Sequence, residues 1–122
     1  MSLEVINLVK RYDTQQAVDQ ISFVAPTGKI TGFLGPNGAG KSTTLNIATG
    51  FIRPTSGDIL VNDISVTDDP MRVKKTVGYL PEHNPLYLEM YVREYLDFIG
   101  KAYGMDRKSR QQRIHELLDL CG

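Results

Sequence analysis

A stretch of eight residues, 35–42, reads GPNGAGKS and places three glycines beside one lysine and one serine. Backbone N–H groups can surround an anion only where no Cβ blocks its approach, so these glycines favour a loop that wraps a charged group. The apolar segment 30–34 precedes the loop, and segment 41–49, which has helical character, follows it. A strand, a glycine-rich loop and a helix in this order indicate an α/β fold.

The loop matches the pattern G-x-x-x-x-G-K-[ST] of a phosphate-binding loop at every position. Lys41 offers a full charge to the terminal phosphates, the Ser42 hydroxyl is a natural Mg²⁺ ligand, and the first N–H groups of the helix add partial positive charge. The alternative is a glycine turn that packs closely and binds nothing, and the strand–helix context favours binding. We therefore expect a nucleoside triphosphate with Mg²⁺. The residues expected to hold it are Gly35, Pro36, Asn37, Gly38, Ala39, Gly40, Lys41, Ser42 and Thr43.

Hydrophobic periodicity predicts strands and turns in the first part of the chain and helices at its end. The predicted strands are 5–9, 21–25, 30–34, 59–61 and 76–80. The strand at 30–34 is apolar enough to suggest burial on both faces. The predicted helices are 41–49, a short one at 70–75, one that runs from about 91 to 104, and one that begins with Asp106 or Ser109 as N-cap.

Composition restricts the partners of the chain. Fourteen basic residues balance fourteen acidic ones, so the net charge argues for neither a nucleic acid nor an anionic lipid surface and excludes only a strongly electrostatic partner. One cysteine, Cys121, cannot form an internal disulfide and fits a reducing compartment. Because no apolar run approaches the roughly 18 residues of a membrane span, we expect a soluble cytoplasmic chain whose membrane role requires a partner.

The segment LVKRY…AVDQISFVAPTGKITGFLGPNGAGKSTTLNIATGFIRPTSGDILVND resembles the opening of an ABC-transporter ATPase subunit. The resemblance implies the N-terminal half of a P-loop NTPase domain, with an antiparallel β region, parallel core strands and the start of a helical subdomain. It also implies ATP as the nucleotide. In this family an aromatic residue upstream of the loop stacks on adenine, and Tyr12 matches it by position. Tyr12 could instead be an ordinary half-exposed strand tyrosine.

The segment VGYLPEHNPLY lies where the family places its Q-loop, whose usual pattern is Tyr/Phe-x-Pro-Gln. Glu82 stands at the glutamine position, so the resemblance implies a catalytic role beside Mg²⁺ and the attacking water. The alternative is that Glu82 points to solvent and does no catalytic work. The segment GYLPEHNPLYLEMYVREYL is most similar to bacterial export-type ABC ATPases, including the gliding-motility subgroup.

The resemblance divides the chain into an ATP-binding core, 1–85, and the start of a helical subdomain, 86–122. No LSGGQ-type signature and no apolar strand ending in Asp-Glu are present, so we expect a truncated domain that binds ATP but does not turn it over alone. The partners implied are a second ATPase subunit and a transmembrane permease, which would hold the protein at the inner face of the cell membrane. The alternative is a P-loop adaptor or regulator without turnover.

Several charged residues are predicted to be solvated. In the turn around 53–58 and at the end of the strand after it, these are Arg53, Asp58 and Asp63. On the last helix a basic set could face a partner, although a solvated helix face explains it more simply. This set consists of Arg107, Lys108, Arg110 and Arg113.

Overall fold

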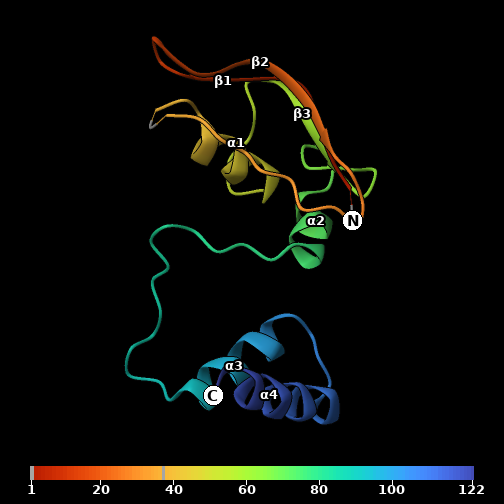
Figure 1. Ribbon diagram of the computed structural model, residues 1–122, viewed down its shortest axis with the longest axis vertical. Helices are drawn as coiled ribbons and strands as arrows, with labels where there is room; N and C mark the ends of the chain where they lie inside the picture. Colours follow the sequence, from red (N-terminus) through yellow and green to blue (C-terminus); the bar gives the residue numbers. More distant parts are fainter. Residues whose placement is uncertain (1, 37) are drawn as a thin grey trace. The chain divides into compact units, whose positions relative to one another are not determined.

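The computed structural model describes residues 2–36 and 38–122 (Figure 1). The chain divides into two compact units, Met1–Tyr79 and Leu80–Gly122. We describe each unit by itself.

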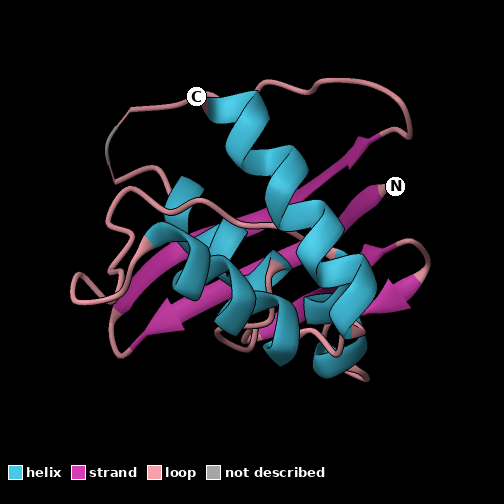
Figure 2. Ribbon diagram, turned by 90° about the horizontal axis from the view of Figure 1, so that it is seen from below, coloured by secondary structure: helices cyan, strands magenta, loops and turns pink. Residues whose placement is uncertain are grey.

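The first unit contains a four-stranded sheet. Its strands are β1 (Leu3–Tyr12), β2 (Gln15–Ala25), β3 (Ser56–Val61) and β4 (Ile64–Ser65). Their order is β2-β1-β3-β4, and each neighbouring pair is antiparallel. The strands β1 and β2 form a long hairpin, and β3 pairs with β1 beside it (Figure 1). Figure 2 shows the strands in magenta. The predicted strands 5–9, 21–25 and 59–61 are therefore confirmed, each as part of a longer strand.

Two helices of the first unit also contribute to its core. They are α1 (Lys41–Ala48) and α2 (Pro70–Thr76), and both were predicted. The helix α2 begins with Pro70 at its first position, and the Asp69 carboxylate accepts a hydrogen bond from the Arg72 N–H at 3.1 Å. Each fully buried aliphatic side chain contributes about 1.5–3 kcal/mol to folding. Those completely or almost completely buried between the sheet and the helices are Val5, Leu8, Ile47, Ile59, Val61 and Val73.

Two predicted strands are wrong. Segment 30–34 has no regular secondary structure, and the side chains of Ile30 and Leu34 are fully exposed. Segment 76–80 is also irregular after α2 ends at Thr76. A strand persists only where a neighbouring strand accepts and donates its backbone hydrogen bonds. Among the described residues, no strand pairs with either segment.

The second unit is an irregular segment followed by a helical hairpin, α3 (Val92–Ala102) and α4 (Arg107–Cys121) (Figure 1). Gly104 turns the chain between the helices with φ 75°. The carboxylate of Asp106 accepts a hydrogen bond from the Ser109 N–H at 3.0 Å, so Asp106 is the N-cap of α4, as one of the two predicted choices. Ile114 is buried between the helices. Within the described ranges, no helix combines the length and apolar character that crossing a bilayer requires.

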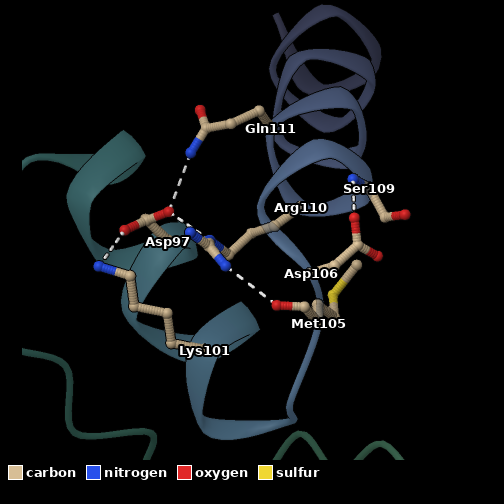
Figure 3. Close-up of polar contacts among 7 residues, drawn as sticks. All are labelled: Asp97, Lys101, Met105, Asp106, Ser109, Arg110 and Gln111. Atoms are coloured by element: carbon tan, nitrogen blue, oxygen red, sulfur yellow. Dashed lines mark hydrogen bonds and ion pairs between the residues drawn. The ribbon is translucent and has the colours of Figure 1, made fainter.

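Arg110 is not part of a solvated helix face, contrary to the prediction. It is buried, and its Nε donates to Asp97 Oδ1 at 2.6 Å while Nη1 donates to the Met105 carbonyl at 3.0 Å (Figure 3). Lys101 and Gln111 also bind the Asp97 carboxylate. The other three basic residues of the set, Arg107, Lys108 and Arg113, are exposed.

Asp58 is likewise not a solvated turn residue. Its half-buried carboxylate accepts hydrogen bonds from Ser65 Oγ at 2.5 Å, from Thr67 Oγ1 at 3.0 Å and from the Ile59 N–H at 2.8 Å. Asp58 therefore connects β3 to Ser65 in β4 and to Thr67 just after β4. Arg53 and Asp63 are exposed, as predicted.

Candidate functional site

The glycine loop closes on itself before it enters α1. The N–H of Ala39 donates to the Pro36 carbonyl at 3.1 Å. The Lys41 ammonium turns back along the loop, where Nζ donates to the Pro36 carbonyl at 2.9 Å and also to the Gly35 carbonyl. The Lys41 ammonium, which is the one full positive charge of the motif, thus contacts backbone carbonyls of the same loop. Asn37, also predicted to contact the nucleotide, lies outside the described residues.

Two glycines of the loop are required for different reasons. Gly40 has φ 90°, and a Cβ there would lie 2.3 Å from the backbone oxygen of Ala17 in β2. A Cβ at Gly35 would point toward the loop, 3.3 Å from Ala39 Cβ and 3.8 Å from Lys41 Cδ. Gly40 therefore lets α1 approach the sheet, and Gly35 leaves the concave side of the loop free of side chain. This bare, closed loop fits an anion such as a polyphosphate.

The start of α1 adds to the positive potential of the loop. Its N-cap is Gly40, which has no side chain and makes no side-chain cap hydrogen bond, and the first turn contains no acidic residue. The first N–H groups of a helix have no intrahelical acceptor, so their partial positive charge is available to a ligand. Within this turn the Ser42 side chain is exposed and that of Thr43 is half-buried.

Tyr12 ends β1 and pairs with Gln15 across the hairpin turn. Its ring is 48% exposed, and Lys10 Nζ lies 5.2 Å from the ring centroid. The next strand, β2, brings Ala17 against Gly40, so the hairpin that has Tyr12 beside its turn contacts the start of α1. A half-exposed ring is compatible with stacking on a base and equally with an ordinary strand tyrosine.

Glu82 belongs to the second unit, whereas the loop and Tyr12 belong to the first. The residue lies in the irregular segment before α3, and its side chain is exposed. Within the first unit, the structure therefore groups the glycine loop with the hairpin that contains Tyr12. A hydroxyl and a carboxylate are both hard oxygen ligands of the type that Mg²⁺ prefers, so the two side chains fit the ion in chemistry.

The contact between Ala17 and Gly40 is a feature of the site that the sequence reasoning missed. Ala17 carries no polar side chain and matches no motif. Its role depends on the backbone carbonyl, which reaches the loop only because β2 folds back on β1. No signal in the sequence could have identified it.

Comparison with known proteins gives a consistent picture. A family model described as "ABC transporter" matches residues 18–122. Two relatives from Bacillus subtilis, the uncharacterized ABC transporter ATP-binding protein YxlF and the linearmycin resistance ATP-binding protein LnrL, are each 35% identical over 120 residues and match 98% of this chain. A solved ATP-binding subunit of an ABC transporter is 33% identical over 98% of the chain, with a TM-score of 0.86. The chain spans 39% of either relative and 50% of the solved subunit.

Proposed function

The chain belongs to the ABC transporter family, whose ATP-binding proteins it resembles in sequence and fold, and we propose that it holds Mg²⁺-ATP for an ATPase that powers export through a separate permease. The observation that carries this proposal is the closed glycine loop at the start of α1, with Lys41 turned toward it. A loop with bare amides, one ammonium and an uncapped helix start is suited to a polyphosphate.

The roles proposed for the loop follow from these positions. Backbone N–H groups between Gly35 and Thr43 surround the β- and γ-phosphates; Pro36 lies in this stretch but has no N–H to donate, and Asn37 is included from the motif alone. Lys41 exchanges its two carbonyl contacts for phosphate oxygens. Ser42 would hold Mg²⁺, and the ion would supply positive charge that neutralises the phosphates. Tyr12 stacks on adenine, an interaction worth roughly 1–3 kcal/mol per base.

Glu82 is proposed to act beside the Mg²⁺ and the attacking water, in the place of the usual glutamine. A carboxylate can ligate Mg²⁺ as well as an amide oxygen can, but it adds negative charge near the γ-phosphate. The 122 residues contain no catalytic base of the family type and no signature sequence. We therefore propose that this stretch binds ATP and that turnover requires a complete domain paired with a second ATPase subunit.

The transport role is inferred from the relatives. The proposal of export is compatible with one relative, which is a linearmycin resistance ATP-binding protein. A permease partner would place the ATPase at the cytoplasmic face of the membrane. The balanced charge of the chain gives no reason to propose a nucleic acid as a further partner. A P-loop adaptor without turnover would bind ATP in the same way, so hydrolysis by the complete domain separates the two functions.

Substitution of the loop lysine tests the proposal directly. Lys41→Ala removes a charge-assisted contact worth about 1.5–3 kcal/mol, which weakens Mg²⁺-ATP binding by roughly ten- to a hundredfold in a calorimetric titration. Lys75→Ala is the matched control, because Lys75 is exposed in the last turn of α2 and outside the loop. Equal affinities in the two variants and the parent chain would refute the assignment.

A further inference from the structure

Two phenylalanine rings join the segment before the glycine loop to strand β2. The centroids of the Phe23 and Phe33 rings lie 5.1 Å apart, with an interplanar angle of 31°. Phe23 belongs to β2 and packs against the buried core of the first unit. Aromatic rings with centroids about 4.5–7 Å apart attract each other beyond the apolar area that they bury. The pair therefore links the core to the chain that enters the loop.

Phe33 differs from the other large apolar side chains of its segment. It is half-buried, whereas Ile30 and Leu34 are fully exposed. Segment 30–34 forms no strand, and among the described residues none of its backbone groups is hydrogen-bonded to the sheet. The Phe33 ring thus gives this segment a contact with the sheet that its backbone does not make.

The same strand also contacts the other end of the loop. In β2 the Ala17 carbonyl lies against Gly40, where α1 begins. The entry of the loop is held in addition by Lys41, whose ammonium binds the carbonyls of Gly35 and Pro36. In the proposed function this ammonium moves to the phosphates. When the nucleotide binds, the entry therefore loses the Lys41 contacts, and the ring pair remains.

We infer that Phe33 is a positioning residue that fixes the entry of the glycine loop to β2 while the phosphates are bound. The inference rests on the function proposed for the loop. Phe33 lies two residues before Gly35, so its ring limits the conformations that the entry can adopt. A loop that adopts the binding conformation for only a fraction of the time binds its ligand more weakly by that fraction. Phe33 therefore acts on phosphate affinity through the loop.

Calorimetric titration of the chain with Mg²⁺-ATP and with inorganic tripolyphosphate and Mg²⁺ measures this role. Phe33→Ala is expected to weaken the binding of both ligands by about two- to tenfold, the range that corresponds to one aromatic pair. The two losses are alike because the loop holds the phosphates and not the adenine. Phe33→Tyr keeps the ring and retains the parent affinities. Leu34→Ala, the matched control, removes an exposed side chain next to the loop and leaves both affinities unchanged.

Phe23→Leu tests the partner ring, because leucine keeps an apolar side chain against the core. It is expected to weaken tripolyphosphate binding as Phe33→Ala does, and the double variant adds little to either. Equal affinities in Phe33→Ala and Leu34→Ala, or a loss confined to Mg²⁺-ATP, would overturn the inference. Should Phe33→Ala not fold, Phe33→Leu replaces it, and parent affinities in that variant would overturn the inference as well. Failure of the parent chain to bind either ligand would instead overturn the proposed function.

Discussion

At Gly40 the backbone of the glycine loop passes so close to β2 that a methyl group would overlap the Ala17 carbonyl oxygen. Gly38, two residues earlier, has a similar φ of 84°, but a Cβ there would meet no atom within 4 Å. Both positions therefore carry the energetic cost of a left-handed backbone for any other residue, but only Gly40 adds the cost of a steric overlap. Only the second cost depends on the tertiary contact with the hairpin.

We expect Gly40→Ala to destabilise the first unit more than Gly38→Ala. Both substitutions place a side chain at positive φ, which costs about 1–2 kcal/mol. Gly40→Ala adds the overlap with Ala17, which costs a further 1–3 kcal/mol or so. Urea unfolding of the two variants measures the difference. Identical midpoints would mean that the loop does not contact β2 as described.

The residues of the candidate site could be read from the sequence where the motif is contiguous. The glycines, Lys41 and Ser42 were all named from spacing alone, because phosphate binding by a loop depends on neighbouring backbone amides. The predictions for Asp58 and Arg110 failed for the opposite reason. Their hydrogen-bond partners, Ser65 for the first and Asp97 for the second, are fixed only after distant segments fold together.

At the scale of elements, the α3–α4 hairpin is held by the ion pair between Asp97 and Arg110 (Figure 3). A Cβ at Gly100 would lie 2.7 Å from Arg110 Cδ, so this glycine makes room for the arginine stem. The side-chain hydrogen bond from Arg110, followed by that from Lys101, lowers the pKa of Asp97 below its ordinary value. The Ser109 N–H lowers the pKa of Asp106 at the start of α4.

We predict that the hairpin loses stability in acid through these two carboxylates. Their pKa values in the folded chain lie below the value of about 3.9 that holds for an unfolded aspartate. The stability they contribute is therefore complete above about pH 4 and is lost as the pH falls through the folded pKa values. Helix content measured by circular dichroism across this window should fall less steeply in Asp97→Asn than in the parent chain. An identical pH profile in the two proteins would contradict the role of this ion pair.

The helices were predictable and two of the strands were not, for one physical reason. The helices α2 and α4 are signalled by local features, a proline and the N-cap residues Asp69 and Asp106. Segments 30–34 and 76–80 have the composition of strands, but a strand also requires a partner that the local sequence does not specify. The hairpin β1–β2 supplies its own partner, which explains why those strands formed as expected.

At the scale of the whole molecule, the fold class inferred from the sequence is confirmed by a solved ABC transporter subunit with the same fold. The chain spans half of that subunit, and its described strands form one antiparallel sheet without the parallel core strands that the resemblance implied. The structure divides into two compact units after Tyr79, and the division at residue 85 stays a prediction. The proposed phosphate loop and the proposed adenine contact both lie within the first unit, so nucleotide binding can be tested on that unit's own residues.

The most direct test of nucleotide binding is to titrate Mg²⁺-ATP into the isotopically labelled chain and follow every backbone amide. If the loop and the first turn of α1 hold the phosphates, saturable shift changes concentrate in 35–43, with a second group at Tyr12 from the adenine ring. A titration that saturates without changes in 35–43, or that gives no saturable change at all, would contradict the assignment of this loop to ATP.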